Sequence, residues 1–101
     1  MNRQTTLSGL PVIDMQAEPV GKVTDVIYDD RDMSPQWAIV KTGRLGAEHC
    51  VPLGNTYIAS AGELVVPFDK MTIKRAPKVG HDHILTPQLE KELRDYFGVA
   101  A

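Results

Sequence analysis

The stretch His81-Asp82-His83 is the part of this sequence that most suggests metal chemistry. Alternate side chains of an extended segment point the same way, so His81 and His83 could both face one ion. A structural zinc site has four ligands, however, and no second pair of ligands is evident in the sequence. Pro77 and Gly80 come just before this stretch. We therefore interpret it as an exposed linker and keep His81 and His83 as weak candidates for a metal site.

His49 and Cys50 are neighbours, and their residue types could suggest a Cys–His catalytic pair. Adjacent residues of a strand point to opposite faces, so these two side chains cannot act together. Cys50 is the only cysteine, which excludes an intramolecular disulfide and an all-cysteine metal site. We predict that Cys50 is a small buried apolar residue.

Carboxylates are the third group with possible chemistry. Asp25 interrupts an otherwise apolar strand, so it lies on the solvent face or is hydrogen-bonded within the fold; we favour the second, a structural role. Asp29, Asp30 and Asp32 surround Arg31 and could attract a divalent cation. Their spacing lacks the glycine and terminal glutamate of a calcium loop, which favours a solvated turn.

The basic residues give little support for nucleic-acid binding. The net charge is −2 and the pI is about 5.8, so the chain has no excess of positive charge to neutralise phosphates. One cluster of Lys and Arg side chains does occur, at Lys70, Lys74, Arg75 and Lys78. No aromatic residue is interleaved with it, so an RNA-stacking surface is not supported. A solvated face, or a patch for an acidic partner, is the favoured interpretation.

Short β-strands must position most of these residues. A chain of 101 residues is one domain. Residues 20–43 form a predicted hairpin with its turn at 29–35, and the irregular apolar pattern of residues 20–28 indicates a strand covered on both faces or a bulge near Gly21. The predicted strands span residues 10–15, 20–29, 37–41, 48–53, 56–59, 63–68 and 70–74. Such closely spaced short strands, separated by Gly and Pro, are typical of a small all-β barrel or sandwich.

The last segment changes to a helical period. Four large apolar residues fall at i, i+4, i+7 and i+8: Leu89, Leu93, Tyr96 and Phe97. Thr86 fits an N-cap, Pro87 the first helical position, and Gly98 the residue just past the C-terminus. The sequence therefore predicts one C-terminal helix that is stable only when it docks on the β-structure.

An ordered series of segments resembles the PRC-barrel domain family, in its stand-alone bacterial form. The matching segments are LSGLPVID at 7–14, VGKVTDVIYD at 20–29, WAIVKTG at 37–43, VPL at 51–53, VVPF at 65–68, KRAP at 74–77 and DHILTP at 82–87. The resemblance implies a mainly β fold, a small bent barrel of about six strands with one C-terminal α-helix. It divides the chain into a mobile arm (1–6), the barrel (7–80), and a linker and helix packed on the barrel (81–101).

The resemblance also implies a role in interaction. The family takes its name from the cytoplasmic part of the photosynthetic reaction-centre H subunit, and a related domain forms one half of a ribosome-maturation factor. In both settings the barrel is a docking or assembly module, so we expect a non-catalytic, homodimeric interaction module with no cofactor and with an unidentified protein partner. The candidate anchors are Tyr28, Trp37, Tyr57 and Phe68. The alternative is that most of these four fill the core.

Two other functions stay open. An enzyme or a small-ligand or metal-binding protein would use His49, His81, His83 or Asp25, but it needs convergent polar groups in a pocket, and so small a barrel has a filled interior. An RNA- or ribosome-associated factor rests on fold analogy alone. The N-terminus lacks signal-peptide features, and no apolar run reaches the ~20 residues of a membrane helix, so we expect a cytoplasmic protein without membrane insertion.

Overall fold

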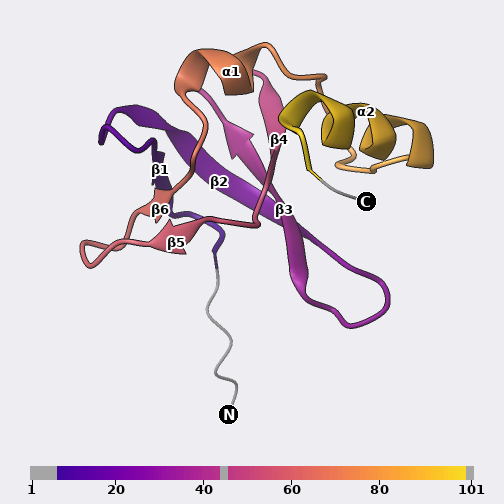
Figure 1. The fold of residues 1–101 in the computed structure, drawn as a ribbon, viewed down its shortest axis with the longest axis horizontal. Coiled ribbons are helices and arrows are strands. Elements are labelled where there is room, and N and C mark those ends of the chain that lie inside the picture. Colours follow the sequence, from indigo (N-terminus) through magenta and orange to yellow (C-terminus); the bar gives the residue numbers. More distant parts are fainter. Residues whose placement is uncertain (1–6, 44–45, 100–101) are drawn as a thin grey trace.

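The computed structural model of the chain describes residues 7–43 and 46–99 (Figure 1). The predicted N-terminal arm and residues 44–45 of the turn after Gly43 lie outside the described residues. The described elements are β1 (Pro11–Ile13), β2 (Pro19–Tyr28), β3 (Pro35–Lys41), β4 (Glu48–Pro52), β5 (Tyr57–Ile58), β6 (Leu64–Val65), α1 (Lys70–Lys74) and α2 (Pro87–Phe97). No helix among them is long and apolar enough to cross a membrane.

All six strands belong to one sheet in the order β4-β3-β2-β1-β6-β5. The neighbours are antiparallel except β1 and β6, which are parallel. The mainly β class and the C-terminal helix are confirmed. Closure of the sheet into a barrel is not confirmed, because β4 and β5 remain its two ends.

β2 is the longest strand, and bulges change its register. Its pairing with β1 shifts between Val12 and Ile13, so that Val20 is the extra residue; the predicted bulge near Gly21 is confirmed. Its pairing with β3 shifts twice more. Bulges bend and twist a strand, which lets β2 curve through the middle of the sheet. Gly21 is needed there because a Cβ atom would overlap the carbonyl oxygen of Lys41.

The core has two clusters, one on each face of β3. Ala38 and Val40 belong to the first cluster, whereas Trp37 and Ile39 belong to the second. The first cluster contains Val12, Val20, Val23, Ala38, Val40, Val51, Leu64, Val66 and Ile73. The second contains Trp37, Ile39, Cys50, Ala76, Val79 and Leu93, so helix α2 covers it. Coverage of both faces explains the near-continuous apolar run of β3.

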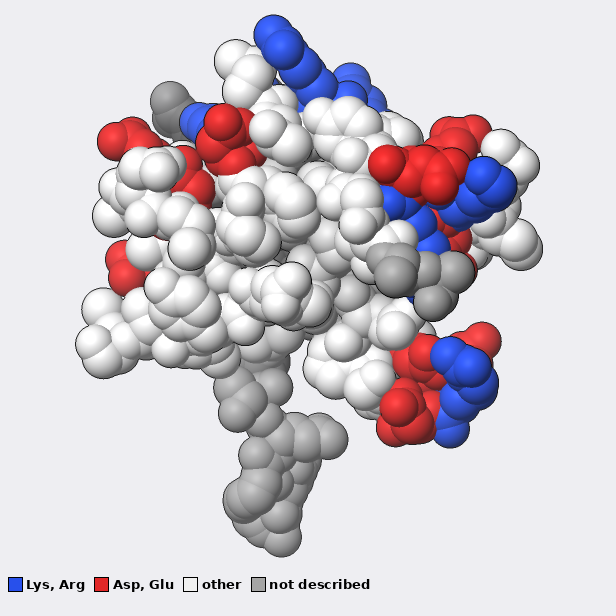
Figure 2. Space-filling model, in the orientation of Figure 1, with Lys and Arg blue, Asp and Glu red and all other residues white. Residues whose placement is uncertain are grey.

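The strand predicted for residues 70–74 is wrong, because this segment is helix α1. The Asp69 side chain is its N-cap and accepts a hydrogen bond from the Thr72 backbone N–H at 2.8 Å. Ile73 is the buried residue of this turn, and it joins the first cluster. The basic cluster therefore lies on and just after a helix, at the top of Figure 2.

The predicted boundaries of α2 are confirmed. Thr86 caps its N-terminus, Pro87 follows, and Gly98 ends it in the left-handed conformation with φ of 73°. Leu93 is fully buried, and the Tyr96 hydroxyl donates a hydrogen bond of 2.6 Å to the carbonyl oxygen of Thr72. Both helices are therefore tied together away from β5 and β6 (Figure 1).

Candidate functional site

Strand β5 is an open edge of the sheet. It pairs with β6 through Tyr57↔Val65 and Ile58↔Leu64, and no strand of the described chain pairs with its other side. Tyr57 is 55% exposed and Ile58 is 44% exposed. An exposed edge that carries large apolar side chains is a template for pairing with another chain.

A shallow apolar groove adjoins this edge. Its volume is about 340 Å³, and its lining consists of Leu7, Pro35, Leu53, Thr56, Tyr57, Ile58 and Leu64. None of these residues carries a charge. In the view of Figure 2 the surface over β5 and β6 is mostly uncharged, whereas charged side chains gather near α1, α2, the β1–β2 turn and the β2–β3 turn.

The opposite edge, β4, is covered. His49 to Pro52 are all buried. The backbone of Lys78 forms a bridge with His49 alongside β4, and α1 packs against the same strand. Within residues 7–43 and 46–99, the chain therefore covers one end of its sheet and leaves the other open.

The four predicted interface residues lie in different environments. Trp37 is 2% exposed and belongs to the second core cluster, and Phe68 packs on Phe97 with ring centroids 4.7 Å apart. Trp37 fills the interior, as the alternative interpretation expected, and Phe68 is partly buried against the first core cluster. Tyr28 and Tyr57 are exposed, but they line two different cavities. A role in an interface stays a prediction for these two tyrosines, and Tyr57 is the one that lies on the exposed edge strand β5.

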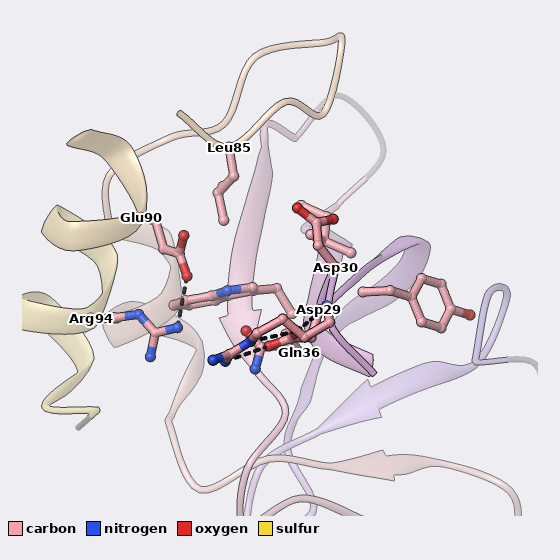
Figure 3. A pocket seen from close by; sticks show the side chains of 10 residues that line it. Asp29, Asp30, Gln36, Leu85, Glu90 and Arg94 are labelled. Atoms are coloured by element: carbon pink, nitrogen blue, oxygen red, sulfur yellow. Dashed lines mark hydrogen bonds and ion pairs between the residues drawn. The ribbon is translucent and has the colours of Figure 1, made fainter. Parts of the chain in front are cut away.

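A second, polar cleft of about 440 Å³ separates the β2–β3 turn from α2 (Figure 3). The Asp29 carboxylate accepts hydrogen bonds from the Arg31 guanidinium, which lower the pKa of Asp29. On the facing helix, Arg94 donates to Glu90 at 2.7 Å and lies 5.9 Å from the centre of the Trp37 ring. The charges of Asp29 and Arg31 therefore offset each other on the turn, and those of Glu90 and Arg94 offset each other on the helix.

The predicted solvated turn is organised by its own aspartates. Asp29 accepts a hydrogen bond from the Arg31 backbone N–H, and Asp32 accepts two from Ser34. The carboxylates are thus engaged in turn geometry typical of Asp.

A cluster of one imidazole and two carboxylates lies elsewhere, on β2, β4 and the linker before α2. The Asp25 Oδ2 atom is 2.9 Å from His83 Nδ1, and the Glu48 Oε1 atom is 2.8 Å from His83 Nε2. Thr24 Oγ1 donates to the other oxygen of Glu48 at 2.8 Å. The hydrogen bond to Glu48, and to a lesser extent the one to Asp25, raises the pKa of His83. The same two hydrogen bonds lower the pKa of each carboxyl group.

This cluster is held together by hydrogen bonds among its own members. Both nitrogens of His83 are already engaged, with the carboxylates of Asp25 and Glu48 on opposite sides of the ring. The described part of the chain contains no group of three or more His, Cys, Asp or Glu residues placed to hold an ion. His81 is exposed, and in the described chain it forms no hydrogen bond with Asp25, Glu48 or His83.

Asp25 was expected to be hydrogen-bonded within the fold. It is hydrogen-bonded, but its side chain is about half exposed, so it acts at the surface and not in the interior. Nothing in the local sequence indicates its partner, because His83 is 58 positions away.

His49 and Cys50 are both buried and belong to opposite faces of β4, as predicted. Burial raises the pKa of the Cys50 thiol to about 12, so the thiolate needed for nucleophilic chemistry is suppressed. Burial, Lys78 and Lys74 lower the pKa of His49, and its Nδ1 atom has no hydrogen-bond partner. The prediction of a buried, apolar Cys50 is confirmed.

Comparison with known proteins addresses the fold directly. A family model described as the PRC-barrel domain matches residues 1–93. The chain belongs to the PRC-barrel domain family. The resemblance inferred from the segments between residues 7 and 87 is thereby confirmed. No curated protein matches this PRC-barrel chain.

Proposed function

We propose that this PRC-barrel domain is a non-catalytic protein-interaction module that forms a homodimer through the β5 edge. The observation that carries the proposal is the open β5 edge, where Tyr57 and Ile58 are exposed beside an apolar groove. An edge strand presents unpaired backbone N–H and C=O groups, so a second strand can extend the sheet there.

A second copy of the chain fits this edge because the edge is uncharged. In a two-fold dimer the same surface patch lies on both sides of the interface, so a patch with one sign of charge would repel its copy. The groove residues Leu7, Leu53 and Leu64 carry no charge, and neither does β5 itself. Two antiparallel β5 strands related by a two-fold axis could therefore join two sheets while burying both copies of Ile58.

The environments of Cys50, His49 and His83 support a non-catalytic role. Cys50 and His49 are buried. Both ring nitrogens of His83 are engaged by carboxylates. A nucleophile or a general base must reach its substrate, and these groups do not present a free reactive atom at a cavity.

The test is the molar mass in solution of the wild-type chain and of Ile58→Lys. We expect light scattering at micromolar concentrations to give twice the chain mass of 11.1 kDa for the wild type and the monomer mass for Ile58→Lys. The charge is expected to act because a lysine on an edge opposes edge-to-edge pairing. Circular dichroism should show that the variant remains folded, since Ile58 is exposed.

Ile84→Lys is the matched control, because Ile84 is also an exposed isoleucine but lies in the linker before α2. It should leave the dimer intact. A monomeric wild type would contradict the homodimer. A dimer that Ile58→Lys leaves unchanged would contradict the β5 interface.

A further inference from the structure

Residues 77–86, which we term the strap, join α1 to α2 and run along the covered end of the sheet. Near its start the strap forms the bridge between Lys78 and His49 of β4. Val79 belongs to the second core cluster and Leu85 packs against it. The strap ends at Thr86, the N-cap of α2. It therefore covers the β4 edge and holds the start of the helix that buries Trp37.

His83 is the residue that fastens the second half of the strap. The backbone hydrogen bonds described for residues 80–86 are local, such as His83 N–H to the Gly80 carbonyl and Ile84 N–H to Asp82 Oδ1. Leu85 adds an apolar contact with the second core cluster, but in the described chain His83 is the side chain of residues 80–86 that forms hydrogen bonds with the sheet. It does so twice, to Asp25 on β2 and to Glu48 on β4.

The backbone at His83 is held in an unfavourable conformation. Its φ angle is 58°, in the left-handed region that residues other than glycine rarely adopt. Such a conformation persists when surrounding contacts over-determine it. The two hydrogen bonds of the imidazole and the bond from the His83 N–H to the Gly80 carbonyl act on this residue, and weakening the imidazole bonds would favour a different path for the strap.

Two hydrogen bonds to carboxylates require a doubly protonated ring. A neutral imidazole has one N–H donor, whereas the imidazolium has two. Loss of one proton from His83 would break one of the bonds and set a ring lone pair against a carboxylate. The charged groups that act on this cluster are Asp25 on β2, Glu48 on β4, and His81 in the strap, which acts on Glu48.

We propose that the second half of the strap, residues 80–86, is a pH-sensitive latch: protonated His83 holds it closed on β2 and β4, and loss of that proton releases it from both strands. The latch is separate from the β5 edge at the other end of the sheet, so it does not depend on dimerisation there.

The pH range of the closed latch follows from the directions of the shifts. The pKa of His83 is raised, so its contribution is complete below the unfolded value near 6.5 and is lost as pH rises through the folded value. The pKa values of Asp25 and Glu48 are lowered, so their contribution is present above their unfolded values and is lost as pH falls through the folded ones. The latch is closed between these limits and opens on the alkaline side by deprotonation of His83.

NMR on the full chain tests the latch in two measurements. The first is the titration of the His83 ring, which should occur above the ordinary histidine pKa and shift downward in both Asp25→Asn and Glu48→Gln. The second is the hydrogen-exchange protection factor of residues 80–86, which corrects for intrinsic base catalysis. We expect it to fall about tenfold as His83 titrates, the effect of losing one charge-assisted hydrogen bond.

His83→Asn is the decisive variant, because asparagine tolerates the left-handed conformation but cannot make the double contact. It should lower protection at neutral pH and remove the pH dependence, while the control Ile84→Ala, at an exposed position of the strap outside the cluster, should keep both. Ordinary titration of His83, or wild-type protection that stays constant through that titration, would overturn the latch. If His83→Asn does not fold, Asp25→Asn and Glu48→Gln decide the question, since each removes one anchor and should move the opening to lower pH.

Discussion

The two edges of the sheet, β4 and β5, are treated in opposite ways. β4 has five residues, His49 to Pro52 are buried, and α1 and the strap lie alongside it. β5 has two residues, both exposed. The chain covers its longer edge itself, whereas the two-residue edge stays exposed in the described chain, where we propose that a second copy pairs with it.

The difference between the two edges comes from the C-terminal segment of the chain. Residues 70–98 add no strand to the sheet; they cover the β4 end and bury the second core cluster through Leu93. The β5 end receives no such cover in the described chain. Stability should therefore depend on the β4 end, and association on the β5 end. The following predictions test this division.

The largest effect on stability is expected for Leu93→Ala. Leu93 is fully buried where α2 meets Trp37 and Cys50, so truncation leaves a cavity in the second cluster. We expect the free energy of unfolding to fall by about 2–5 kcal/mol, measured by urea denaturation. Ile84→Ala, at an exposed position of the strap, is the control and should change it by less than about 0.5 kcal/mol. Equal effects of the two variants would contradict the role of α2 as a cover.

A smaller loss is expected for Thr86→Ala. The Thr86 hydroxyl oxygen accepts a hydrogen bond from the Leu89 backbone N–H at 3.1 Å, and this bond caps α2. Its removal should cost about 1 kcal/mol of the free energy of unfolding. Thr86→Ser retains the cap and should restore most of the loss. A serine variant as unstable as the alanine variant would mean that the methyl group, and not the cap, matters.

The smallest effect on folding is expected at the open edge. Tyr57→Ser removes an exposed ring from β5, so the free energy of unfolding of the monomer should change by less than about 0.5 kcal/mol. The same variant should weaken dimerisation, measured by sedimentation at increasing concentration. A large loss of monomer stability would place Tyr57 in the core and remove the contrast between the two edges.

Helix α2 was predictable because its signals are local. Thr86, Pro87 and Gly98 mark its ends within one stretch of sequence, and each choice reflects the geometry of its own turn. The five residues of α1 were misassigned as a strand, although Asp69 three positions before Thr72 is a local capping signal. So short a helix offers too few residues for its period to be recognised.

The placement of the candidate interface residues was less predictable. Trp37 and Tyr57 are both large aromatic residues in predicted strands, but one is in the core and the other is exposed. The sequence does not show which strand ends up at the edge of the sheet. That depends on the order β4-β3-β2-β1-β6-β5, in which β5 follows β4 in the chain but lies at the opposite end.

The amino-acid sequence by itself determined the family, the mainly β class, the bulge near Gly21, the C-terminal helix and the buried state of Cys50, because these depend on local patterns of residues. Only the tertiary structure decided that the sheet stays open, which edge is exposed, and that His83 lies between Asp25 and Glu48. These partners are 58 and 35 positions from His83, so their meeting depends on how the strap crosses the folded sheet and not on any local pattern.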